Sequence, residues 1–173
     1  MAIRTKTQEL LISLEDLLVQ EFRTLQELIS VTKKEREVLS KNDTISLMRL
    51  VEEKEAVLDQ IGLMEDNRHM VLQELAVAFG KKTQSYSLKE ILPLLSATEA
   101  GRLDRLSDGI LTLVAQAKDL NYGNRALAIS MTAWLQSAQN FLLNISHPQV
   151  FYNPTAIAPR LETVTLGGLD HRA

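Results

Sequence analysis

The feature that most constrains this chain is a continuous heptad stripe between residues 97 and 145. Apolar side chains recur there at alternating steps of three and four residues, with one polar exception, over about six heptads. The stripe consists of Leu103, Leu106, Ile110, Leu113, Ala117, Leu120, Asn124, Leu127, Met131, Trp134, Ala138, Phe141 and Ile145. Side chains at this spacing share one face of a helix. The stripe therefore predicts one long helix that packs along a single seam, as in a coiled coil.

Two further amphipathic helices are predicted upstream, over residues 7–40 and 44–79. The first 79 residues contain one Gly and no Pro, so neither helix is interrupted. Asp43 is placed to cap the start of the second helix, and Gly80 is placed to end it. The apolar positions of the two helices are Leu11, Leu14, Leu18, Phe22, Leu25 and Ile29 in the first, and Leu47, Val51, Leu58, Ile61, Leu72, Leu75 and Phe79 in the second.

A short linking helix is predicted between the second helix and the long one. Ser87 and Glu90 form a capping-box pattern at its start, and Pro93 disturbs it soon afterwards. Ser96 and Glu99 repeat the pattern and open the long helix. We expect an all-α fold with three long antiparallel helices in a coiled-coil-like bundle.

The predicted bundle comprises residues 1–145, and residues 146–173 form an extended or flexible tail. The tail cannot continue the helix because it contains Pro148, Pro154, Pro159, Gly167 and Gly168. Its aliphatic and aromatic residues are nevertheless too frequent for an inert linker. We therefore expect a tail with anchoring side chains.

Composition excludes several classes of function. Aromatic residues make up only 5% of the chain, which favours helix-on-helix packing over a β-sandwich. The net charge of −3 does not predict a nucleic-acid partner, and no apolar run resembles a signal peptide or a membrane span. With no Cys, the chain has neither a disulfide framework nor a thiolate site. A cytoplasmic protein without membrane insertion is the simplest prediction.

No arrangement of side chains predicts catalysis or a metal site. His69, His147 and His171 form no pair with metal-ligand spacing on one helix face. The acidic residues around Lys54, and the charged stretch 33–37, alternate in sign as on a solvated helix face. We expect no enzyme activity and no cofactor.

The predicted helix lengths do not match. At about 1.5 Å per residue, the third helix would span roughly 70 Å and each of the others roughly 50 Å. About 20 Å of its apolar seam would lie beyond the hairpin formed by the first two helices. The linking helix, a second copy of the chain or another protein could cover it.

Asn124 is the polar exception in the seam, and two interpretations remain open. A polar residue at one core position often fixes the register of a bundle. Alternatively, it belongs to a surface that recognises a partner helix, together with the apolar residues that follow it. The candidate partner-binding residues are Asn121, Asn124, Leu127, Met131, Trp134, Leu135, Phe141 and Leu142.

Several segments resemble the FlgN-type flagellar export chaperones. Asp43, Leu47 and residues 50–58 are similar to an acidic, Leu-rich helix of that family. Residues 120–125, Leu-Asn-Tyr-Gly-Asn-Arg, are similar to its paired asparagines, and residues 151–154, Phe-Tyr-Asn-Pro, to its Tyr-containing segment. The likeness covers about residues 7–155 in order and spacing. The tail after Pro154 is longer than the family's.

The resemblance implies a cytoplasmic chaperone that needs no cofactor. Its clients would be the C-terminal helical regions of the two hook–filament junction proteins. The chaperone would prevent their premature assembly and deliver them to the flagellar export gate, with Tyr152 as the docking residue. A self-associating structural coiled-coil protein is the alternative, and the free protein would be a monomer or a homodimer.

Overall fold

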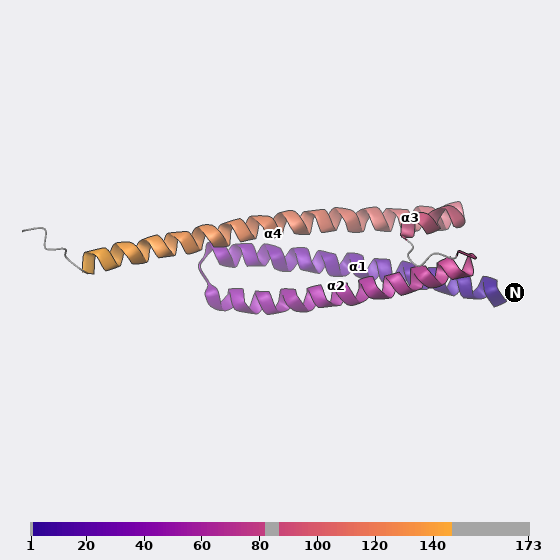
Figure 1. The fold of residues 1–173 in the computed structure, drawn as a ribbon, viewed down its shortest axis with the longest axis horizontal. Helices are drawn as coiled ribbons and strands as arrows, with labels where there is room; N and C mark the ends of the chain where they lie inside the picture. Colours follow the sequence, from indigo (N-terminus) through magenta and orange to yellow (C-terminus); the bar gives the residue numbers. More distant parts are fainter. Residues whose placement is uncertain (1, 82–86, 147–173) are drawn as a thin grey trace, which may run out of the picture. The chain divides into compact units, whose positions relative to one another are not determined.

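The computed structural model describes residues 2–81 and 87–146, with side chains from 6 to 81 and from 87 to 143. Its long helices are α1 (Ala2–Ser40), α2 (Thr44–Ala78) and α4 (Ala97–Ser146). A short helix α3 (Leu88–Ile91) and the 3-10 turn η1 (Leu92–Leu94) lie between α2 and α4. The described residues contain no strand, and the all-α prediction is confirmed (Figure 1).

The helices begin and end where local side chains satisfy the free backbone groups. The Asp43 carboxylate accepts a 3.0 Å hydrogen bond from the amide of Ser46, which caps α2. Gly80, at φ +73°, terminates α2, since the amide of Lys81 can then donate back to the carbonyl of Ala76. At the start of α3, Glu90 accepts from the amide of Ser87 at 2.8 Å. These predicted start and stop signals are confirmed.

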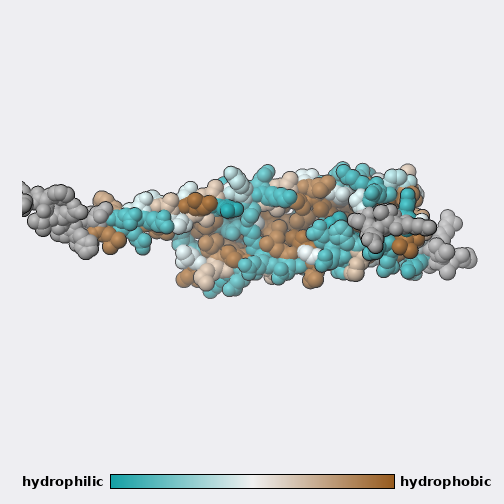
Figure 2. All heavy atoms as spheres, in the orientation of Figure 1, coloured by the Kyte–Doolittle hydropathy of each residue, from teal (hydrophilic) through white to brown (hydrophobic). Residues whose placement is uncertain are grey.

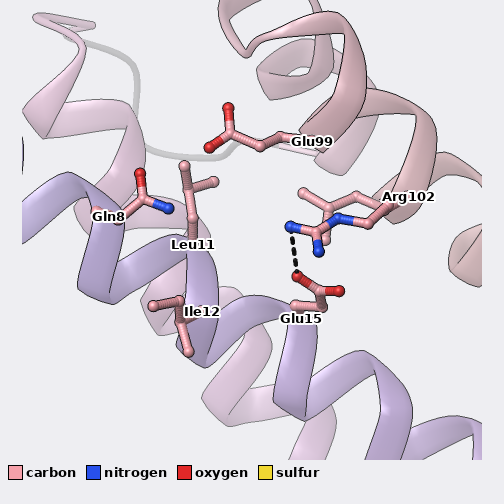
Figure 3. Close-up of a pocket in the computed structure, with 7 residues that line it drawn as sticks. Gln8, Leu11, Ile12, Glu15, Glu99 and Arg102 are labelled. Carbon is pink, nitrogen blue, oxygen red and sulfur yellow. Dashed lines mark ion pairs between the residues drawn. The ribbon is translucent and has the colours of Figure 1, made fainter.

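Helix α1 runs parallel to α4, and α2 runs antiparallel to both. Glu15 pairs with Arg102 at 3.2 Å near the start of α4, and Asn124 bonds the carbonyl of Thr32 further along. Residue numbers therefore rise together along α1 and α4. Figure 3 shows the Arg102 guanidinium of α4 meeting the Glu15 carboxylate of α1. The α1–α2 hairpin reverses the chain once, and the α3 region reverses it again.

Helix α1 supplies more of the core than any other helix, because it packs against both other long helices. Leu14, Leu18 and Val31 of α1 are completely or almost completely buried. Helix α2 adds Leu72, Leu75 and Ala76, while α4 adds Leu103, Ile110 and Ala117. Leu88 and Ile91 of α3 join the same core. Helix α1 is thus the central helix of the bundle, and both α2 and α4 pack against it.

The chain divides into two units, Met1–Ala133 and Trp134–Ala173. The first unit holds α1, α2, α3 and α4 up to Ala133. The described part of the second unit is the last turns of α4, from Trp134 to Ser146. The predicted boundary between bundle and tail, at residue 145, lies inside this second unit. Ser146 is still part of α4, and the rest of the predicted tail, residues 147–173, lies outside the described residues.

Glu21 of α1 and Arg68 of α2 form an ion pair inside the hairpin. Glu21 is only 5% exposed, and its Oε2 lies 3.2 Å from the Nε of Arg68. Burial raises the pKa of the Glu21 carboxyl, and the nearby Arg68 charge only partly offsets this effect. The folded state therefore binds a proton at Glu21 more readily than the unfolded chain does.

The contact between α1 and α4 can be tested at two glycines of α4. A Cβ at Gly109 would lie 2.9 Å from the Phe22 ring of α1, whereas a Cβ at Gly101 would meet nothing within 4 Å. Replacing Gly by Ala inside a helix stabilises it by about 1 kcal/mol. We expect this gain for Gly101→Ala and less or none for Gly109→Ala in urea unfolding. Equal gains at both positions would contradict the packing of Phe22 on Gly109.

The Glu21 carboxyl makes the unfolding free energy depend on pH. Its contribution is fully present below the ordinary glutamate pKa of 4.5 and is lost as pH rises through the raised folded-state value. Glu21→Gln removes this titration. Urea unfolding should therefore show the variant gaining stability relative to the natural protein between pH 4 and pH 7. Glu53→Gln, at an exposed position of α2, serves as control. Parallel pH profiles for all three proteins would show that the Glu21 carboxylate is not desolvated.

Candidate functional site

A polar cluster joins the three long helices near the middle of α4. We call it the Asn124 cluster, and its members are Thr32, Glu35, Lys54, Asn121 and Asn124. The Glu35 carboxylate of α1 accepts from Lys54 Nζ of α2 at 2.7 Å and from Asn124 Nδ2 of α4 at 2.9 Å. Asn124 Nδ2 also donates to the carbonyl of Thr32 at 2.8 Å. Lys54 Nζ donates in turn to Asn121 Oδ1 at 2.7 Å.

Asn124 lies inside the bundle. It is 3% exposed, and its Oδ1 has no hydrogen-bond partner among the described residues. Both donor contacts of its amide are to α1. This geometry favours the register interpretation of Asn124, because a slip of α4 by one heptad would place Ala117 or Met131, both apolar, against the Glu35 carboxylate. Asn121 is exposed, and Lys54 binds it from α2.

The charged residues of this cluster are not on a solvated face. The side chains of Glu35 and Lys54 are only 13% and 15% exposed. The sequence analysis was wrong for Glu35 and Lys54, which it placed on a solvated helix face. Alternating charges along one helix do not show that a charged residue of another helix will pack against it. Since each ion has its partner at 2.7 Å, the cost of removing it from water is offset.

Beyond Asn124, the apolar positions of α4 are progressively less covered. Between Arg125 and Leu143 none of the side chains is buried. Leu127 and Met131 are half-buried in the first unit. The incomplete covering agrees with the mismatch in predicted helix length.

The described part of the second unit has large apolar side chains in contact with solvent. Trp134 and Phe141 are each 65% exposed, and Leu135 and Leu142 are 52% and 62% exposed. Trp134 and Phe141 are seven residues apart, as are Leu135 and Leu142, so the two pairs form adjacent rows on the helix. We call these four residues the α4 apolar stripe. They are all among the predicted partner-binding residues, whereas Tyr152 lies outside the described residues.

A second apolar surface lies in the first unit, between α2 and α4. It is a groove with a volume of about 290 Å³ and with α1 as its floor. We call it the three-helix groove. Figure 2 shows hydrophobic side chains gathered along the middle of this face, between hydrophilic edges. Its lining residues are Leu25, Leu28, Thr32, Lys54, Leu58, Ile61, Val114, Ala117, Lys118 and Asn121.

The sequence did not predict the three-helix groove. Leu58 and Ile61 belong to the predicted stripe of α2, which we expected to be covered by other helices. Here Leu58 is 47% exposed. The available signal was the width of the apolar face of α2, which exceeds what one neighbour covers. Only the spacing between α2 and α4 shows which part of that face remains open.

Two other hollows carry less functional information. A groove of about 410 Å³ between α1 and α4 is lined partly by charged side chains, among them Glu15, Arg102 and Arg105. A pocket between Gln8 and Glu99 has a volume of about 10 Å³, which accommodates about one water molecule (Figure 3). Hydrogen bonds from Ser96 hold the pKa of Glu99 below its ordinary value. This carboxylate therefore acts as a helix cap.

Neither a metal cluster nor a membrane-spanning helix is found in the described residues. No three His, Cys, Asp or Glu side chains gather there as metal ligands would. No helix within residues 2–81 and 87–146 combines the length and hydropathy that a membrane span requires. The exposed apolar surfaces described above are of the kind that marks interaction sites on proteins.

Comparison with known proteins gives one family. The model of the family described as FlgN protein matches residues 3–159, which is most of the chain. Searches of curated proteins and of solved structures gave no match.

The Asn124 cluster makes a prediction for bundle stability. In Asn124→Ala, the Thr32 carbonyl and the Glu35 carboxylate lose a donor, and unfilled space remains in the core. Leaving a buried acceptor unsatisfied costs about 1–3 kcal/mol. Urea unfolding should show a loss in that range, and Asn140→Ala, at an exposed position of α4, should change little. Similar losses for both variants would remove the basis for a register role.

Proposed function

We propose a specific role for this chain from the premise that it belongs to the FlgN family, whose members are flagellar export chaperones. Its clients are the C-terminal helical regions of the hook–filament junction proteins. In the cytoplasm the chain binds these regions, prevents their premature assembly and delivers the clients to the export gate. It does so as a binding protein, without catalysis and without a cofactor.

The α4 apolar stripe carries this proposal. Exposed apolar patches on soluble proteins mark interaction sites, and Trp is strongly enriched among residues that dominate binding energy. Trp134 and Phe141 are each 65% exposed as residues. When a partner covers such a ring, on the order of 100 Å² of apolar surface is removed from water. This burial contributes about 2–3 kcal/mol to the binding free energy.

The stripe has the geometry to bind a helix. Its two rows at seven-residue spacing follow the helix axis, as the seam of a coiled coil does. An amphipathic client helix with apolar residues at the same period would place its side chains between these rows. Ala138, which is half-buried and lies between Trp134 and Phe141, would let the client backbone approach closely. Client C-terminal helices of this kind are the partners that the family resemblance implies.

In the first unit, the proposed client contacts are Leu127, Met131 and Asn121. Leu127 and Met131 already lie partly within the bundle, so they add less new contact area than Trp134 does. Asn124 supports the surface indirectly by fixing α4 on α1. Export-gate docking is assigned to Tyr152.

The α4 apolar stripe also favours a second candidate, a structural protein that associates through its own α4. Two copies could cover each other's exposed rings with the same geometry. Light scattering distinguishes the candidates. A dimer that persists at nanomolar concentration and does not exchange for client favours the structural candidate. A monomer, or a dimer that the client dissociates, favours the chaperone.

The client proposal is tested by calorimetry with a peptide from the C-terminal helix of a junction protein. Binding should have a negative heat-capacity change, because apolar surface is buried. Trp134→Ala should weaken the affinity by about tenfold or more, which corresponds to about 1.4 kcal/mol or more. Gln136→Ala, two residues away and also exposed, should bind normally.

Unfolding curves provide the control for this experiment. Because Trp134 is 65% exposed, Trp134→Ala should unfold at the same urea concentration as the natural protein. Unchanged affinity in the double variant Trp134→Ala and Phe141→Ala would exclude the α4 apolar stripe as the client site.

A further inference from the structure

Helix α2 carries a row of exposed apolar side chains on the side opposite its buried face. Leu63, Met70 and Val77 are 66%, 57% and 67% exposed. They recur at steps of seven residues, so they form one row along the helix. Leu72, which is buried in the core, follows Leu63 by nine residues, or about two and a half turns, and therefore lies on the other side of α2. The row thus takes no part in the packing of α2 on α1.

A row of carboxylates runs beside this apolar row. Glu52, Asp59 and Asp66 also recur at steps of seven residues, and all three are exposed. Each aspartate precedes an apolar residue of the first row by four positions, so the two rows are adjacent on the helix. Neither Asp59 nor Asp66 has an ion-pair partner within the described residues. We call the two rows together the α2 outer seam, and its members are Glu52, Asp59, Leu63, Asp66, Met70 and Val77.

The basic side chains of this stretch of α2 are engaged elsewhere. Among residues 52–77, Lys54 and Arg68 are the only Lys or Arg. Each pairs with a glutamate of α1, at 2.7 Å and 3.2 Å. Their side chains are only 15% and 22% exposed. The α2 outer seam therefore presents to solvent an apolar row next to a negatively charged row, without basic side chains to neutralise it.

We propose that the α2 outer seam binds an amphipathic helix of another protein, one that carries an apolar row next to a row of Lys or Arg. Rows at seven-residue spacing have the geometry of a coiled-coil seam. The partner's apolar row packs on Leu63, Met70 and Val77, and its basic row pairs with the carboxylates. From Glu52 to Val77 the seam is about 38 Å long, so a partner helix of about 28 residues covers it.

The charges of the α2 outer seam select this partner over two others. A second copy of the chain, related by a two-fold axis, would bring its own acidic row to the seam, and like charges would oppose association. The acidic row would also repel an anionic membrane surface. A basic amphipathic helix complements both rows. Because the seam shares no residue with the α4 apolar stripe, this binding is additional to the proposed client binding.

Calorimetry with two designed peptides tests the proposal on the full chain. The first peptide is a helix of about 28 residues with Leu in one heptad row and Lys in the adjacent row. The second has Glu in place of every Lys. We expect the Lys peptide to bind, and the Glu peptide to bind at least about tenfold more weakly. Equal affinities, or no binding of the Lys peptide, would overturn the proposal.

Two charge reversals form a matched pair for this measurement. Asp66→Lys, on the α2 outer seam, and Asp119→Lys, on α4, change the net charge equally at exposed positions. Asp66→Lys should weaken binding of the Lys peptide by about tenfold and strengthen binding of the Glu peptide, whereas Asp119→Lys should leave both affinities unchanged. Equal weakening in the two variants would show a response to overall charge and would contradict binding at the seam.

A second pair of variants tests the apolar row. Leu63→Gln combined with Met70→Gln removes two of its side chains. The control, Leu111→Gln combined with Ile129→Gln, removes two exposed apolar side chains of α4. Because all four residues are exposed, we expect the urea midpoint to hold in both proteins. The α2 variant should lose binding of the Lys peptide and the control should retain it, so the reverse result would exclude the seam.

Two further measurements identify other occupants and other sites. If Trp134→Ala abolished binding of the Lys peptide, the peptide would occupy the α4 apolar stripe, and the proposal would fail. Light scattering of the protein alone should give the same mass for the natural protein and for the Leu63→Gln, Met70→Gln variant. A dimer that this variant dissociates would assign the seam to a second copy instead. Since neither peptide contains a client sequence, failure here leaves the proposed chaperone role unaffected.

Discussion

The three long helices depend on one carboxylate for their mutual register. Glu35 accepts hydrogen bonds from Lys54 of α2 and Asn124 of α4, both shorter than 3.0 Å. Each bond would be costly to break, because both side chains are largely removed from water. If α4 slid along α1 by one heptad, a similar apolar area would be buried. The polar contacts of Glu35 would be broken. The Asn124 cluster therefore selects one alignment among several that hydrophobic packing alone would allow.

That alignment separates the two halves of α4. Before Asn124, Leu103, Ile110 and Ala117 are buried in the core, whereas none of the described side chains after Asn124 is buried. The same helix thus serves as a core element and as an exposed apolar surface. This division leaves large apolar side chains of α4 exposed while the core of the bundle stays packed.

The sequence predicts the bounds of the helices well, but it does not predict which residues of different helices contact one another. Heptad spacing and the caps at Asp43 and Ser87 are local signals, so they located the helices within a few residues. The pairing of Glu35 with Lys54 joins positions 19 residues apart on different helices, and no local pattern encodes it. Asn124 was recognisable as special because it alone interrupts the seam. The three-helix groove depends on the spacing between α2 and α4, which the sequence does not specify.

The central claim is that client helices bind the exposed end of α4 while the bundle remains intact. Backbone hydrogen–deuterium exchange, with and without a junction protein's C-terminal peptide, tests it most directly. The claim predicts that the peptide slows exchange from Trp134 to Leu143 and leaves α1 near Thr32 and Glu35 unchanged. Protection confined to α1 and α2, with none between Trp134 and Leu143, would contradict it.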